Sequence, residues 1–281
     1  MTERGAAPVA GTASEDVSRL QSPLLAITAL LALSAADAGA ETIASARYSA
    51  PVERYGHFAL GRPHEYARLT ATTDGGRLHT LELPDDQVFE DLHPRLLSLA
   101  AAEPPEILVI VSQRDRGSRL ALIRLRDGRL EIGAQAPAIG TPMRWLNPVG
   151  AADLDGDGQA EIAAVSTPHI GGELKVYRRR GDRLIEVAAL SGFSNHVYGS
   201  SELELSTPIA RAGRMQLLVP DASRRQLRII ALHDDRLLET GHCPLPAALT
   251  GAITLVSPST LSVELLSGRQ LISLNECLAS R

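Results

Sequence analysis

The stretch GAADLDGDGQAEIAAV, at positions 150–165, holds four carboxylates within nine residues. Three aspartates stand at alternate positions, two glycines permit a tight turn, and a glutamate closes the set. Calcium accepts six to eight oxygen ligands at about 2.3–2.6 Å, whereas acids this close without a cation repel one another and show raised pKa values. The segment therefore predicts one bound Ca2+ ion, and a solvated acidic turn without a metal is the alternative. The expected ligands are the side chains of Asp153, Asp155, Asp157 and Glu161 and the main-chain carbonyl of Gln159.

An EF-hand loop opens with the same D-x-D-x-D-G pattern, but its twelfth position must be glutamate. Here that position is Ala164, and the residues on both sides are typical of strands instead of the helices that an EF-hand needs. The pattern therefore excludes an EF-hand.

Polar and aromatic residues gather in four loops that each precede the first strand of a predicted repeat. The loops read GRPHEY (61–66), EDLHPR (90–95), MRWLNP (143–148) and SNHVYG (194–199). Three contain histidine and one contains the only tryptophan, so converging loops could supply donors, bases, an anion clamp and a stacking platform for a ligand. The alternative is that these side chains plug a narrow channel by mutual hydrogen bonds. This predicted ligand face consists of His64, His93, Arg144, Trp145, Asn147, Asn195 and His196.

Short β-rich runs separated by turn signals must position both sets of residues, because no long helical periodicity appears after residue 41. Five runs share a polar residue followed by leucine: RLHTLEL at 77, RLALIRL at 119, ELKVYRR at 173, QLRIIAL at 226 and QLISLNE at 270. Repeats of this size are typical of four-stranded propeller blades. We predict an all-β chain with one β-propeller of about five blades over residues 41–281. Six blades or a β-sandwich are the alternatives.

The segment ADLDGDGQAEIAAV is similar to the calcium loop of FG-GAP/VCBS repeats, which occur in integrin-type and bacterial β-propellers. The resemblance extends over about 30 residues, through GGELKVYRR. It implies that the loop joins the inner two strands of a blade and that the acidic residue at the ninth position closes the calcium site. A shift of 55 residues aligns Glu106 with Glu161, but Ser98, Ala100 and Ala102 then replace the other acids. We therefore expect a single calcium ion with a structural role.

The first 40 residues are typical of a signal peptide. An apolar run at 24–33 follows Arg19, and the small residues Ala38 and Ala40 fit an A-x-A cleavage site. The run is too short to span a bilayer as a helix. We predict cleavage after Ala40 and a periplasmic or secreted bacterial protein without a transmembrane span. A buried helix is the alternative.

The chain has only two cysteines, Cys243 and Cys277. In an oxidising compartment such a pair can be bridged, and we predict a disulfide between the last two repeats, although the sequence leaves its geometry open. The formal net charge of −5 argues against a nucleic-acid-binding protein.

Two classes of function fit these features. The first is an exported, calcium-stabilised β-propeller that acts as a non-catalytic binding or scaffold module, a monomer that holds a protein or carbohydrate-like partner at one end of its channel. The second is an exported hydrolase or lyase built on the same His/Arg/Trp loops. The chain has no G-x-S-x-G, H-E-x-x-H or P-loop motif, which favours the first class. A histidine within about 3 Å of a carboxylate at the channel mouth would favour the second.

Overall fold

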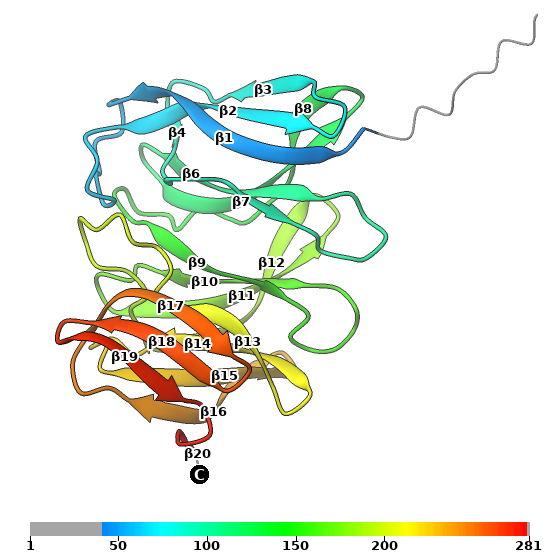
Figure 1. Cartoon of the computed structure of the whole chain (residues 1–281). Coiled ribbons are helices and arrows are strands. Elements are labelled where there is room, and N and C mark those ends of the chain that lie inside the picture. The colour runs from blue at the N-terminus through cyan, green and yellow to red at the C-terminus, as the bar shows by residue number, and fades with distance from the viewer. Residues whose placement is uncertain (1–40, 280–281) are drawn as a thin grey trace, which may run out of the picture. The chain divides into compact units, whose positions relative to one another are not determined.

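The computed structural model describes residues 41–279 (Figure 1). The predicted signal peptide, residues 1–40, lies outside the described residues. Residues 41–279 form twenty β-strands and no helix, so the all-β prediction is confirmed. A helix long and apolar enough to cross a membrane is therefore also absent from this part of the chain.

The strands form five successive antiparallel groups, which we call groups 1 to 5. Group 1 contains β1 (Ile43–Val52), β2 (Glu65–Thr73) and β3 (Leu78–Glu82). Group 2 contains β4 (Gln87–Phe89), β5 (Arg95–Leu97), β6 (Glu106–Gln113), β7 (Gly117–Arg126) and β8 (Arg129–Gln135). Group 3 contains β9 (Leu146–Ala152), β10 (Glu161–Ser166), β11 (Gly172–Arg180) and β12 (Arg183–Phe193). Group 4 contains β13 (Thr207–Arg211), β14 (Arg214–Pro220), β15 (Gln226–His233) and β16 (Arg236–Pro244), and group 5 contains β17 (Leu249–Ser257), β18 (Thr260–Leu265) and β19 (Gly268–Ser273). The short β20 (Leu278–Ala279) returns to pair with β16.

Groups 1, 3, 4 and 5 are meanders in which each strand pairs with the next one along the chain, whereas in group 2 both β4 and β5 pair with β6 before β7 and β8 continue the meander. The five predicted leucine-containing runs fall on β3, β7, β11, β15 and β19, so the predicted repeat is confirmed as a repeat of strands. Tight turns close the hairpins: Asp127 and Gly128 both have positive φ angles between β7 and β8, as do Asp234 and Asp235 between β15 and β16. Two consecutive residues with positive φ match the right-handed twist of the strands they join.

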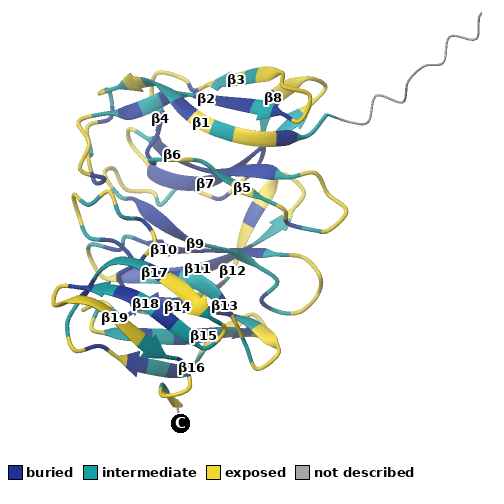
Figure 2. Ribbon diagram, in the orientation of Figure 1, coloured by how far each residue is buried: buried dark blue, intermediate teal, exposed yellow. Residues whose placement is uncertain are grey.

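Side chains alternate between two cores along the inner strands, because successive residues of a strand point to opposite faces. Leu108 and Ile110 of β6 pack against group 3, whereas Ile107, Val109 and Val111 of the same strand pack against group 1. Figure 2 shows the resulting buried runs on β6 and β7. Four apolar cores arise in this way, each between two successive groups. Burial on both faces explains why β6 and β10 read as continuous apolar runs.

The first and last groups depart from the predicted four-stranded unit. Group 1 and group 5 each have three strands of their own, and β4 pairs with both β2 and β6. Within residues 41–279, no strand pairing and no apolar core joins group 1 to group 5. The structure of residues 41–279 is therefore an all-β succession of antiparallel groups, and it shows no strand pairing that closes them into a ring.

Cys243 and Cys277 form a disulfide, with their Cα atoms 4.4 Å apart, so the predicted bridge is confirmed. Cys243 lies on β16 of group 4, and Cys277 follows group 5 directly before β20. The bridge therefore ties the last two groups together at the edge where β20 pairs with β16.

Candidate functional site

The acidic loop joins β9 to β10, the first two strands of group 3. Its aspartates organise the turn by accepting backbone N–H groups. Asp153 accepts one from Gly156 at 2.7 Å and one from Gly158 at 3.0 Å, and both glycines have a φ angle of +87°. Asp155 and Asp157 each accept the N–H of the residue two positions later, at 3.0 and 2.8 Å. The glycines supply the left-handed backbone that this arrangement requires.

Three of the predicted ligands converge. Asp153, Asp155 and Glu161 each offer a carboxylate oxygen, and these oxygens lie within 4.8 Å of one another. We call these three residues the acidic triad. The carboxylate of Asp157 is not part of this set. The backbone of Gln159 forms a β-bridge with Ala100 of group 2, which anchors the end of the loop.

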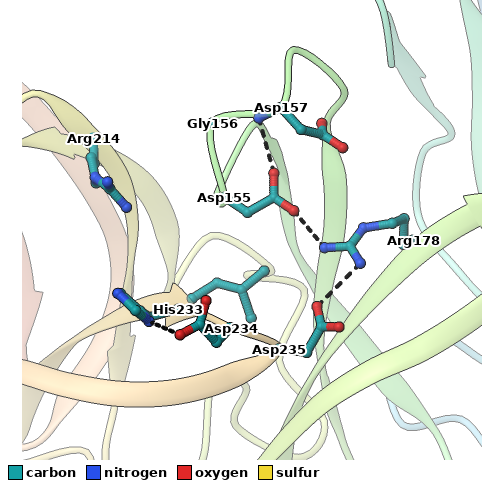
Figure 3. Close-up of a pocket in the computed structure, with 9 residues that line it drawn as sticks. Asp155, Gly156, Asp157, Arg178, Arg214, His233, Asp234 and Asp235 are labelled. Carbon is teal, nitrogen blue, oxygen red and sulfur yellow. Dashed lines mark hydrogen bonds and ion pairs between the residues drawn. The ribbon is translucent and has the colours of Figure 1, made fainter.

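Arg178 of β11 is a cation already present beside the triad (Figure 3). Its guanidinium donates to Asp155 Oδ2 at 2.5 Å, to Glu161 Oε1 at 3.0 Å and to Asp235 Oδ1 at 3.1 Å. One arginine thus pairs with two carboxylates of the loop and with a third from group 4. The local charge remains negative after Arg178 is counted.

Glu161 is the most buried acid of the triad, with a fully buried side chain. Its Oε2 accepts the N–H of Leu154 at 3.0 Å. Burial raises the pKa of the Glu161 carboxyl, and repulsion from Asp155 acts in the same direction, while the bonds from Leu154 and Arg178 oppose the shift. A carboxylate in this position is stabilised by further positive charge.

A pocket of about 530 Å³ opens beside the loop, between groups 3 and 4 (Figure 3). It is strongly polar, and the aspartates from the two groups face each other across it. Its charged lining residues are Asp155, Asp157, Arg178, Arg214, His233, Asp234 and Asp235.

Four residues of the predicted ligand face do come together. Asn147 donates from its side chain to the carbonyl of Asn195 at 3.1 Å, and Asn195 donates to the carbonyl of Asn147 at 3.2 Å. The ring centroids of Trp145 and His196 are 4.9 Å apart, and the indole N–H donates to the carbonyl of Glu90 at 2.9 Å. All four side chains are fully or almost fully buried. They therefore link loops to one another, as the alternative of mutual hydrogen bonding predicted.

His169 belongs to the same cluster, although it was not among the residues of the predicted ligand face. His196 Nε2 lies 3.1 Å from the carbonyl of Ser200 and must donate to it, so its Nδ1 is an acceptor in the neutral ring. His169 Nε2 then donates to that Nδ1 at 2.7 Å. Burial lowers the pKa of each imidazole to about 4, and for His169 the neighbouring His196 adds to the effect. Both rings are thus neutral at pH 7.

A second pair lies close by and was also missed. His57 Nδ1 is 2.6 Å from Glu90 Oε1, and the hydroxyl of Ser112 donates to the other oxygen of Glu90. Burial raises the pKa of Glu90, while His57 and Ser112 oppose the shift. Tyr198 connects the two histidine pairs, because its ring contacts both His57 and His169. Its side chain is exposed, which gives this group of rings a solvent-facing edge.

The remaining residues of the predicted ligand face lie elsewhere. His64 packs its ring edge-on against Tyr66, with the centroids 5.2 Å apart. His93 is exposed and lines a different pocket with Arg95. Arg144 donates to the carbonyl of Met143. The ring partner of His64 and the lining of the pocket at His93 include neither Trp145 nor His196, so the structure places these two histidines apart from that cluster.

Comparison with known proteins gives no match: no family model matches the chain, and neither does any curated protein searched. The resemblance to FG-GAP/VCBS repeats thus depends on the acidic loop and the strands that follow it, and family membership stays a prediction.

Proposed function

We propose that this protein is a calcium-stabilised, non-catalytic binding or scaffold module of the FG-GAP/VCBS type. The observation that supports the proposal best is the acidic triad, in which three carboxylates from one loop converge within 4.8 Å. Hard oxygen donors brought together by a tight loop are the ligands that calcium selects.

The charge balance at the loop supports a divalent cation. The single positive charge of Arg178 is shared among Asp155, Glu161 and Asp235. Within the part of the chain that the structure describes, the donors to Asp153 are by contrast the backbone N–H groups of Gly156 and Gly158. A calcium ion bound by the triad would add two positive charges where Glu161 is buried and repelled by Asp155. Calcium would compete with Arg178 for the carboxylate oxygens of Asp155 and Glu161, so the affinity of the site for calcium depends on this arginine.

The proposal includes the finer fold, in which groups 1 to 5 are the blades of a β-propeller. It is supported by the succession of meanders of similar length and by the cores between neighbouring groups. Ring closure would bring group 1 against group 5. An experimental structure that places these groups apart would contradict it.

Export from the bacterial cytoplasm is also part of the proposal. The disulfide between Cys243 and Cys277 is consistent with an oxidising compartment. Mass spectrometry of the protein recovered from the envelope should show a chain that begins near Glu41, and a full-length cytoplasmic chain would contradict export.

Calcium binding is tested by thermal melting in EDTA and in increasing calcium. A ligand that binds only the folded state stabilises it by about 2.7 kcal/mol at a concentration of one hundred times Kd. We expect calcium to raise the melting temperature of wild type, and Asp155→Asn to abolish the rise. Asp127→Asn, which changes an exposed aspartate in another turn, is the matched control and should respond like wild type. Asp157→Asn tests the one side chain that the resemblance assigns as a ligand but that lies outside the triad. Identical wild-type melting curves in EDTA and calcium would contradict the proposal.

An exported hydrolase or lyase is the second candidate, and the pair of His57 and Glu90 favours it. A carboxylate at 2.6 Å from Nδ1 orients the ring and leaves Nε2 available as a general base. Hydrolysis of a panel of ester and glycoside substrates by wild type, with loss in His57→Gln, would support this candidate over the binding module.

A further inference from the structure

A second polar pocket, of about 680 Å³, lies where group 2 meets group 3. It shares no lining residue with the pocket beside the acidic loop. Its charged and amide lining residues are Gln113, Arg116, Arg119, Gln135, Asp182 and Arg183. The charge of its lining is thus the opposite of that around the acidic loop, with three arginines and one aspartate.

The backbone around this pocket is fixed. Gln135 at the end of β8 and Arg183 at the start of β12 form the single parallel bridge that links groups 2 and 3. The N–H of Gln135 donates to the carbonyl of Asp182 at 3.2 Å. Main-chain contacts therefore join the two sides of the pocket, and they hold the backbone of Arg183 next to that of Gln135.

Arg119 of β7 is the most informative residue of the pocket, because it is only 9% exposed. Its Nε donates to the side-chain oxygen of Gln135 and its Nη2 to that of Gln87, both at 2.9 Å. These neutral acceptors use two of the five N–H donors of the guanidinium, and three remain. Among residues 41–279, no carboxylate forms an ion pair with Arg119.

The nearby acids Asp86 and Asp182 form no ion pair with Arg119 within residues 41–279. Arg116 and Arg183 also form no ion pair within the described part of the chain. Burial lowers the pKa of Arg119; Asp86 opposes this shift, and Arg116 adds to it. The carboxylate of Asp86 accepts a hydrogen bond from Gln113 at 3.0 Å. A buried cation without a paired anion is costly for a folded protein.

We propose that this pocket binds an oxyanion group, a carboxylate, sulfate or phosphate, between Arg119, Arg116 and Arg183. The planar fork of a guanidinium matches the oxygens of all three groups, and Arg119 lines the pocket together with Arg116 and Arg183. Such a ligand supplies the counter-charge that the fold lacks around Arg119. The site is independent of the calcium proposal, because no residue is shared between them.

The test is titration calorimetry on the full chain with sodium sulfate, sodium phosphate and sodium succinate, at constant ionic strength set with sodium chloride. We expect saturable binding of at least one probe, and the preferred probe distinguishes a tetrahedral from a carboxylate ligand. Arg119→Gln should weaken this binding by about tenfold or more, because it removes charge-assisted hydrogen bonds. Arg129→Gln removes the same charge from an exposed arginine outside the pocket and should leave binding unchanged.

Circular dichroism identifies a variant that does not fold. If Arg119→Gln fails to fold, the paired substitution of the exposed Arg116 and Arg183 by glutamine decides the question, with the same expected loss. Absence of saturable binding of all three probes to wild type would overturn the proposal. Unchanged affinity in the folded pocket variants would also overturn it, because it would mean a non-specific salt effect.

Discussion

Replacing Arg178 by glutamine should destabilise the calcium-free protein, and by more at pH 7 than at pH 5. The change removes the guanidinium that donates to Glu161 and Asp155 but keeps a side chain of similar reach. Among residues 41–279, the N–H of Leu154 would then be the remaining donor to Glu161, whose side chain is fully buried.

The size of the effect follows from which acids are buried. Removing one partner of a buried ion pair costs about 3–5 kcal/mol, whereas the pairs of Arg178 with the more exposed Asp155 and Asp235 each add at most about 1 kcal/mol. Glu161 can also avoid the buried charge by taking up a proton. Relative to an ordinary glutamate pKa near 4.3, this uptake costs about 4 kcal/mol at pH 7 and about 1 kcal/mol at pH 5. We therefore expect the free energy of unfolding to fall by about 3–4 kcal/mol at pH 7 and about 1–2 kcal/mol at pH 5.

The direction of the pH dependence has the same origin. Burial already raises the pKa of Glu161 in wild type, and removal of Arg178 takes away an interaction that lowers it. When a carboxyl pKa is raised in the folded state, stability is lost as the pH rises above the ordinary glutamate value. The loss should therefore extend to higher pH in the variant than in wild type.

Urea unfolding in EDTA, followed by far-ultraviolet circular dichroism at pH 5 and pH 7, measures these differences. Arg129→Gln, at an exposed position without an ion pair within residues 41–279, is the control for loss of a surface charge. Calcium should stabilise Arg178→Gln more than wild type, because the competing cation is gone. An equal loss of stability at both pH values, or no greater response to calcium, would refute the reasoning.

Two further predictions concern other parts of the fold. Replacing Cys243 and Cys277 together by alanine should lower the free energy of unfolding by about 2–4 kcal/mol, measured by urea denaturation, and a reductant should then have no further effect on the variant. The buried pair of His169 and His196 has pKa values of about 4, below the ordinary value of 6.5, so wild-type stability should be lost as the pH falls from about 6.5 toward 4. His169→Gln should remove about half of the pair's contribution to that slope, and an unchanged slope would contradict the assignment.

Local signals predicted the strands and the acidic loop well. Each turn residue and each apolar alternation acts within a few positions of the chain, so β7, β11 and β15 could be located from sequence alone. The arginine that pairs with the acidic loop, Arg178, could not be located in this way. Arg178 reaches Glu161 because Ile162 pairs with Tyr177, and this register is visible only once the two strands are aligned.

The histidine cluster shows a second feature that could not be predicted from the sequence, namely which histidine side chains point inward. Composition pointed to the right loops, but it did not distinguish the inward from the outward side chains. His57 and His64 lie seven positions apart, yet His57 pairs with Glu90 whereas His64 packs against Tyr66. The choice between them depends on where the chain turns before β2, in a loop whose His57 and Ala59 carbonyls accept hydrogen bonds from Tyr198 and Gly199 of a distant segment.

The apolar cores between successive groups also determine the order in which parts of the protein unfold. Because each core joins only two neighbours, stability approaches a sum of nearest-neighbour terms along the stack. Group 5 is covalently fastened to group 4 through Cys243, whereas group 1 is held to group 2 by packing and by the short pairing through β4. With no apolar core between groups 1 and 5 within residues 41–279, opening should start at group 1 and proceed toward group 3, whereas closure of the proposed ring would remove this order. Amide hydrogen exchange would record this order as protection that rises from β1 toward β10.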